Sequence, residues 1–138
     1  MEIPSKNFIN LQNRLTNLLL QMGANTYHVG YRYLKDCVII VMQKHGSVKS
    51  IVKELYTAVA NDYDVTFSNV ERSIRHCIGS MWNKTRVEVI NKAFGLNIFT
   101  HLDVPTNGQL ITLIAERLSQ EYMFVENNVV ICLNDKLS

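Results

Sequence analysis

Apolar residues in the first third of the chain recur at the three- and four-residue spacing of amphipathic helices. Residues 8–22 predict a first helix that stops at Gly23, a residue type that often ends helices. Residues 29–42 predict a second helix, capped by Thr26 and ending near Gly46. Its VIIV run is locally strand-like, but the helical spacing begins well before that run, so we assign the whole segment to a helix.

The middle of the chain predicts two helices separated by a short polar link. Ser47 opens the third helix, whose apolar positions continue to Tyr63. After the link at residues 62–66, the fourth helix (residues 66–84) directs one apolar face inward, made of Val70, Ile74, Cys77, Ile78, Met81 and Trp82. Two helices joined by about four residues indicate a helix-turn-helix.

The last third predicts two more helices and an ambiguous end. A fifth helix covers residues 86–94 and is closed by Gly95. The sixth follows Pro105, where Thr106 and Gln109 have the spacing of a capping box. The final segment MFVENNVVICL is rich in β-branched residues around Glu-Asn-Asn. It leaves two alternatives open, a short β-hairpin or an extended tail that docks on another surface.

Composition agrees with a helix-rich globular chain. Hydrophobic residues make up 47% of the 138 positions and charged residues 19%, with six Gly and two Pro, which argues against disorder and against a turn-rich β-sandwich. We therefore predict an all-α fold of about six helices. We divide it into a helical domain at residues 1–122 and a C-terminal extension at residues 123–138.

The sequence lacks the patterns of catalytic and metal sites. The three Cys are odd in number and lie in apolar stretches, so we expect reduced thiols. The four His form no HExxH motif, and there is no Gly-rich phosphate loop and no GxSxG nucleophile motif. We predict no enzyme, no cofactor and no metal site. The chain also shows no signal-peptide pattern and no membrane-length apolar run, which predicts a cytoplasmic protein with no membrane partner.

Positive charge gathers in the middle of the chain. The net charge is only +2, so the distribution of charge is more informative than its size. Between residues 66 and 92, Glu71 and Glu88 stand against five basic residues, Arg72, Arg75, Lys84, Arg86 and Lys92. The positive potential therefore concentrates on the fourth helix and just after it.

The fourth helix presents a polar face opposite its apolar one. Helical geometry places five residues there: Asn69, Arg72, Arg75, His76 and Gly79. Arg can donate two parallel hydrogen bonds to guanine in the major groove, and Glu can accept one from cytosine. Arg72 and Arg75 suit the first role, and Glu71, in the first turns, suits the second. We interpret this face as a surface that contacts bases in double-stranded DNA.

Simpler interpretations of the same residues stay open. Ser68 and Glu71 also have capping-box spacing, in which case Glu71 satisfies a backbone donor instead of a base. Arg72 and Arg75 could be solvated surface charges. Spacing alone favours a partly buried, hydrogen-bonded His76.

Five blocks of sequence resemble one known family in order and separation. They are QMGANTYHVGYRYLKDCV, SIVKELYTAVANDYDVT, SNVERSIRHCIGSMW with its VERSIRH centre, NKAFG and VPTNGQLITLIAERL, with W, FG and PTN at the expected distances. Over roughly residues 11–121, the chain resembles the C-terminal DNA-binding effector domain of the stage zero sporulation protein A family.

The resemblance implies a six-helix effector domain whose fourth helix enters the major groove at TGTCGAA-like boxes. It implies base-reading or groove-lining roles for four residues, Glu71, Arg72, Arg75 and His76. It further implies phosphate contacts by Ser50 and Lys53 on the preceding helix. We add Ser68 and Asn69, at the start of the fourth helix, to the candidate DNA-binding residues.

The chain also departs from the family pattern. The family domain normally follows a phosphorylatable receiver, whereas about ten residues precede the first helix here, so we expect control without a receiver. Asn69 stands where the family usually has an arginine, which removes one DNA contact. Gly79 lies in the middle of a helix, at a cost of about 1 kcal/mol relative to Ala. Residues 123–138 extend beyond the family domain, and their apolar, acidic character suggests a contact other than DNA.

Two functions follow from these patterns. The first is a sequence-specific transcriptional regulator that binds double-stranded DNA through the helix at residues 66–84, acting as a pair of copies on tandem or inverted boxes. The alternative is a receiver-less protein-interaction module that modulates the full-length sporulation regulator or RNA polymerase. A homodimer partner, RNA polymerase and a sigma factor are therefore the candidate protein partners.

Overall fold

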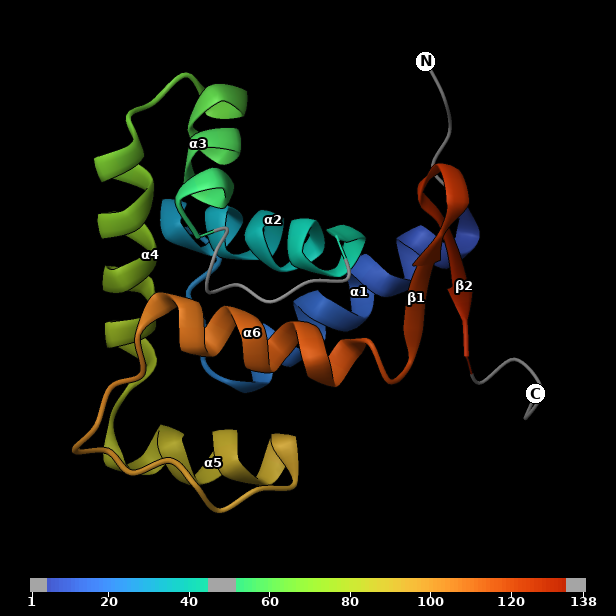
Figure 1. Cartoon of the computed structure of the whole chain (residues 1–138). Helices are drawn as coiled ribbons and strands as arrows, with labels where there is room; N and C mark the ends of the chain where they lie inside the picture. The colour runs from blue at the N-terminus through green and yellow to red at the C-terminus, as the bar shows by residue number, and fades with distance from the viewer. Residues whose placement is uncertain (1–4, 45–51, 134–138) are drawn as a thin grey trace.

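The computed structural model describes residues 5–44 and 52–133, and helices dominate it (Figure 1). The elements in chain order are α1 (Lys6–Gln21), α2 (Val29–Lys44), α3 (Val52–Tyr63), α4 (Phe67–Met81), α5 (Lys84–Phe94), α6 (Asn107–Leu118), β1 (Tyr122–Val125), a 3-10 turn η2 (Glu126–Asn128) and β2 (Val129–Cys132). Within the described residues, the predicted six-helix, all-α architecture is confirmed. The C-terminal segment adopts the hairpin, one of its two predicted alternatives.

Polar side chains determine where the first two helices begin. Ser5 caps α1, because its hydroxyl accepts a hydrogen bond from the Phe8 backbone N–H at 3.1 Å. The predicted cap of the second helix, Thr26, is wrong because this residue lies in a turn that precedes the helix. At α2, His28 Nδ1 instead accepts from the Gly30 backbone N–H at 3.2 Å. The VIIV run is helical, as predicted.

Helices α3 and α4 form the predicted helix-turn-helix. The chain leaves α3 through Asp64, which has a left-handed backbone conformation (φ 55°). The Val65 backbone N–H donates to the Ala60 carbonyl at 3.0 Å and so satisfies the end of that helix. The Thr66 hydroxyl then caps α4 by accepting from the Asn69 backbone N–H at 3.1 Å.

Some predicted helix bounds differ from the structure. The fourth helix is shorter than residues 66–84, because Trp82 leaves helical geometry (φ −98°, ψ 87°) and Asn83 starts the next helix. Gly46 and Ser47, expected to end the second helix and open the third, lie outside the described residues.

The last two helices carry the caps that their sequences predict. Asn83 caps α5 by accepting from the Arg86 backbone N–H at 3.0 Å, and Gly95 ends it in the left-handed conformation (φ 66°). At α6 the capping box is complete. The Thr106 hydroxyl accepts from the Gln109 backbone N–H at 3.2 Å, while Gln109 Oε1 accepts from the Thr106 N–H at 2.9 Å.

Strands β1 and β2 pair antiparallel in a hairpin that packs on α1 and α2. Asn127 and Asn128 make the turn with positive φ angles of 60° and 57°, a conformation that Asn tolerates well. Phe124 and Val130 lie opposite each other, and both are buried. The Phe8 ring of α1 contacts the Phe124 ring edge-on, at 6.3 Å between centroids.

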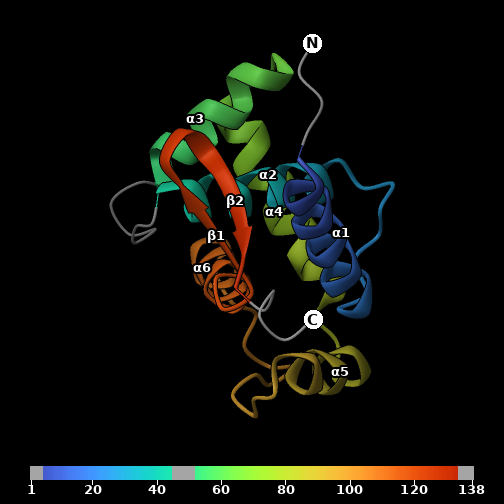
Figure 2. The ribbon, with the colours of Figure 1, turned by 90° about the vertical axis from the view of Figure 1, so that its right-hand side faces the viewer.

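Helix α2 lies in the centre, with α4 and α6 as its main neighbours (Figures 1 and 2). Gly30 permits the close contact with α4, since a Cβ atom at this position would overlap the Ser73 carbonyl. In Figure 1 α4 and the hairpin lie on opposite sides of the central helices, and in Figure 2, which is turned by 90°, the hairpin lies in front of them. Within the described ranges, no helix combines the length and apolarity that crossing a bilayer requires.

Candidate nucleic-acid interface

Helix α4 separates a buried face from an exposed one. Five apolar residues are buried against the core: Val70, Ile74, Cys77, Ile78 and Met81. Five residues of the opposite face are exposed, as predicted: Asn69, Arg72, Arg75, His76 and Gly79. The interpretation of His76 as a partly buried, hydrogen-bonded residue is therefore wrong, because this side chain is exposed.

The capping-box interpretation of Ser68 and Glu71 is also wrong. Thr66 is the residue that caps α4, so Ser68 lies inside the first turn with an exposed side chain. The half-buried Glu71 carboxylate instead forms an ion pair with Arg75, one turn further along the helix. The pair restrains the Arg75 guanidinium against the surface of α4 before any ligand is present.

The other arginine on this face is not restrained in the same way. Arg72 is exposed and has no ion-pair partner among residues 5–44 and 52–133. Next to it, Asn69 Oδ1 accepts a hydrogen bond from the Ser73 hydroxyl at 3.3 Å. The face thus combines one arginine held by a carboxylate with one that can adapt its conformation.

Further basic side chains lie on the neighbouring helices. Lys53 is exposed near the start of α3, whereas Ser50 lies outside the described residues. Lys84 and Arg86 are exposed in the first turn of α5, which follows α4 after two residues. The positive charge predicted for the middle of the chain is therefore on the surface of the protein.

An open groove of about 690 Å³ lies between α4 and the start of α6. Glu71, Arg75 and Gly79 line it from α4, Tyr56 from α3, and Asn107 from α6. The polar face of α4 thus continues into a concave surface bordered by the first turn of α6.

Asn107 connects the three helices that surround this groove. Its side chain is buried, with 8% exposure, and its Nδ2 donates to the Glu71 backbone carbonyl of α4 at 3.0 Å. It also hydrogen-bonds the hydroxyl of the buried Tyr56 of α3. Burial raises the pKa of Tyr56, and the hydrogen bond from Asn107 lowers it in part. The PTN block in the sequence contains Asn107, but the sequence does not indicate the hydrogen bonds from Asn107 to α3 and α4.

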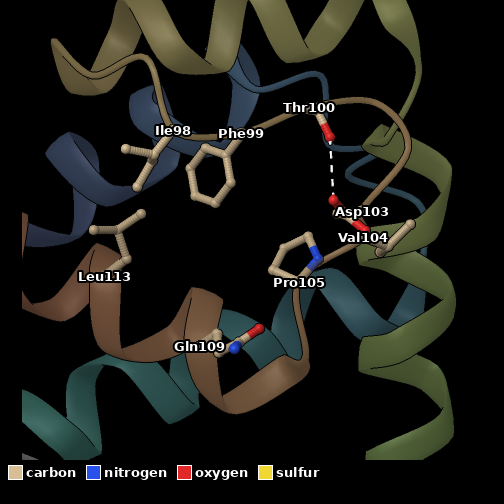
Figure 3. A pocket seen from close by; sticks show the side chains of 8 residues that line it. All are labelled: Ile98, Phe99, Thr100, Asp103, Val104, Pro105, Gln109 and Leu113. Atoms are coloured by element: carbon tan, nitrogen blue, oxygen red, sulfur yellow. Dashed lines mark hydrogen bonds between the residues drawn. The ribbon is translucent and has the colours of Figure 1, made fainter.

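A second surface feature lies on the segment between α5 and α6. It is an apolar pocket of about 350 Å³. In Figure 3, Ile98, Phe99 and Leu113 lie on one side of this pocket and Pro105 on the other. The segment is attached to α5, because the Asn91 side chain hydrogen-bonds both the backbone N–H and the carbonyl of Phe99, at 3.1 and 2.9 Å. Ile98 is nevertheless 64% exposed, and the nearby Leu102 is 79% exposed.

The site therefore combines a basic, exposed helix in a helix-turn-helix with a buried polar contact that fixes its position. Comparison with protein families yields a match to the model described as sporulation initiation factor Spo0A C terminal, over residues 15–118. The chain belongs to this family. The domain is a DNA-binding effector that regulates transcription in sporulation, so DNA binding is the general function of this family.

Membership in the Spo0A C-terminal family agrees with the predicted resemblance and extends from within α1 to the end of α6. The hairpin lies beyond the matched residues. In the portion of the chain that the structure describes, no three His, Cys, Asp or Glu side chains cluster as metal ligands would. The chemistry available on α4 is hydrogen bonding and charge pairing with a polyanion.

Proposed function

We propose that this protein is a cytoplasmic, sequence-specific regulator that binds double-stranded DNA by inserting α4 into the major groove. The observation that carries the proposal is the exposed, basic face of α4 within a helix-turn-helix of the Spo0A C-terminal family. A helix placed in this way can bring arginine side chains to the edges of base pairs.

Each residue on the face has a separate proposed role. Arg72 and Arg75 donate to guanine, and Glu71, which orients Arg75, accepts from the amino group of a neighbouring cytosine. His76, one turn after Arg72, lines the groove further along the helix. A TGTCGAA-like box is the proposed target sequence.

The remaining candidate residues contact the DNA backbone in this proposal. Ser68 and Asn69 lie in the first turn of α4, at the positive end of the helix dipole, which favours a phosphate. Lys53 on α3 supplies a positive charge to the phosphates, and we propose that Ser50, which precedes this helix, donates a hydroxyl hydrogen bond to them. Such contacts increase affinity without selecting a sequence.

The end of the family match supports a division of the chain into a domain and an extension. We propose that residues 1–122 form the effector-like domain and that residues 123–138 are an addition to it. The family match ends at residue 118, before the first strand of the hairpin. We further propose that two copies act together on DNA.

Alanine substitutions of the two arginines test the base contacts. Arg72→Ala and Arg75→Ala should each weaken binding to a boxed duplex by about 1–3 kcal/mol and binding to a scrambled duplex by much less. Lys6→Ala is the matched control. Lys6 is an exposed basic residue of α1 and is followed by Asn7, which contacts the hairpin. Equal losses on both duplexes would contradict sequence recognition by these arginines.

A second candidate function is a protein-interaction module for RNA polymerase or a sigma factor. The exposed apolar residues Ile98 and Leu102 beside the apolar pocket favour it, because exposed apolar patches often mark binding sites for proteins. Ile98→Glu should then abolish binding to purified RNA polymerase holoenzyme and leave DNA binding unchanged. Unchanged polymerase binding by this variant would exclude the segment as the contact.

A further inference from the structure

The hairpin has apolar side chains on both of its faces. Phe124 and Val130 point inward and are buried on the core. Because side chains alternate along a strand, the neighbouring positions point outward, and they form two cross-strand pairs, Met123 with Ile131 and Val125 with Val129. We call these four residues the outer hairpin face.

An apolar outer face is unusual for such a sheet. Antiparallel sheets with one face on the core normally have polar residues on the other. Here Met123, Val125 and Val129 are 40%, 37% and 51% exposed, and Ile131 is partly exposed. The free energy of hydration therefore favours covering this surface with another apolar surface.

The free edge of β2 is less suited to binding another strand. The Asn7 side chain of α1 donates from Nδ2 to the Val130 backbone carbonyl at 3.1 Å. That carbonyl is one that a strand added next to β2 would need. A partner is therefore expected to pack on the outer hairpin face and not to extend the sheet.

We propose that the outer hairpin face binds the same face of a second copy of this chain, with a two-fold axis that relates the two hairpins in opposite directions. The face is uncharged, so two copies meet without like-charge repulsion, as an isologous interface requires.

The charges at the two ends of the hairpin select the antiparallel arrangement. Exposed Glu126 lies at the turn. At the base, Glu121 is shared between Arg14 at 3.0 Å and Arg117 at 2.8 Å, which leaves this cluster with one excess positive charge. Opposite directions place the acidic turn of each copy over the basic cluster of the other.

The size of the face determines the expected strength. Four partly exposed side chains cover far less than the roughly 800 Å² per partner of a standard stable interface. The dimer should therefore form reversibly with rising protein concentration and should not be permanent.

The position of the face has a consequence for DNA binding, and this step alone rests on the proposed function. The hairpin and α4 lie on opposite sides of the central helices (Figure 1). Two copies joined at their hairpins keep both α4 helices free, so the pair can hold two separate segments of DNA.

Sedimentation velocity of the full chain over a wide range of concentrations tests the interface without DNA. The wild type should shift from monomer towards dimer as concentration rises. Val129→Glu should raise the dissociation constant by at least about tenfold, since two like charges then enter a small apolar interface. Leu102→Glu, which places the same charge on another exposed apolar residue, should dimerise like the wild type.

A second pair of variants tests the antiparallel arrangement. Glu126→Lys should weaken the dimer several-fold at low salt, and the loss should shrink as salt screens the new repulsion. The control, Glu88→Lys, reverses an exposed charge on α5 and should leave dimerisation unchanged. Equal dimerisation by Glu126→Lys and the wild type would overturn the opposed arrangement of the hairpins.

The decisive results are separable from those on DNA binding. A wild type that stays monomeric at every concentration, or a well-folded Val129→Glu that dimerises like it, would overturn the proposal. Met123→Lys provides an independent disruption if Val129→Glu melts at a lower temperature than the wild type. Binding to a duplex with a single box should be the same for Val129→Glu and wild type, so a loss there concerns the α4 site and not the hairpin.

Discussion

Replacing Asn107 with alanine tests how the recognition helix is held in place. The Asn107 side chain donates to the Glu71 carbonyl of α4 at 3.0 Å and bonds the Tyr56 hydroxyl of α3. Alanine removes both bonds. We expect the variant to fold but to be less stable, with α4 less firmly attached to α3 and α6.

The expected loss in the free energy of unfolding follows from the hydrogen bonds that Glu71 and Tyr56 lose. The Glu71 carbonyl lies within a helix, so it loses only an additional bond, worth about 1 kcal/mol. The Tyr56 hydroxyl is buried, and leaving it without a partner costs about 1–3 kcal/mol. Asn107→Ala should therefore lower the free energy of unfolding by about 2–4 kcal/mol.

Urea unfolding of Asn107→Ala, Tyr56→Phe and the double variant measures this free energy directly. Tyr56→Phe alone should cost about 1 kcal/mol, but in the Asn107→Ala background it should recover part of the lost stability, since it removes a buried hydroxyl that already lacks a partner. The coupling between the two substitutions isolates their hydrogen bond.

Asn91→Ala is the matched control for DNA binding. It also removes two hydrogen bonds of a half-buried amide, but those bonds hold Phe99 in the segment after α5. Only Asn107→Ala should weaken DNA binding at a temperature where both variants are folded. A loss of less than about 0.5 kcal/mol for Asn107→Ala, or additive effects with Tyr56→Phe, would refute the reasoning.

Three further substitutions or titrations test the packing of α2 and α4. Gly30→Ala should be strongly destabilising in thermal melts, because its Cβ would overlap the Ser73 carbonyl; a melting temperature equal to that of the wild type would contradict the close helix contact. Gly79→Ala meets no atom within 4 Å and should instead stabilise the protein by about 1 kcal/mol through helix propensity, which the same melts would show. Burial raises the pKa of Cys37 to about 12 and that of Cys77 to about 11, from 9.0, so the folded protein keeps protons that the unfolded chain releases. Stability should therefore fall as the pH rises above 9, and a urea midpoint that is constant across this window would argue against buried thiols.

The helices were predictable because their apolar spacing is long and regular. The cap of α6 was predictable too, since Thr106 and Gln109 supply both halves of one local motif. The cap of α4 was not, because Thr66, Ser68 and Asn69 are all residue types that cap helices. Only the path of the preceding turn determines which of them sits at the first position.

The exposed face of α4 was also predictable, whereas its internal contacts were less so. Helical periodicity placed Arg72 and Arg75 outward without knowledge of the rest of the fold. The pairing of Glu71 with Arg75 has a recognisable four-residue spacing, but Glu71 also has capping-box spacing with Ser68, and the sequence alone does not decide between the two. The bond between Asn107 and Glu71 joins residues 36 positions apart, so no local pattern indicates it.

The hairpin illustrates a different limit of sequence reasoning. Its β-branched residues indicated a strand, but a strand with apolar residues at every position does not show which face is buried. Contacts with Phe8 and Asn7 of α1 decide this, and they are more than a hundred residues away in the chain.

The most direct test of the central claim is fluorescence anisotropy of the purified protein on two labelled duplexes, one with a TGTCGAA box and one scrambled, at two salt concentrations. We expect tight binding that depends on the box and weakens steeply with salt, as phosphate contacts release counterions. Weak binding of equal strength to both duplexes would contradict sequence recognition by α4 and would leave only its electrostatic attraction to DNA.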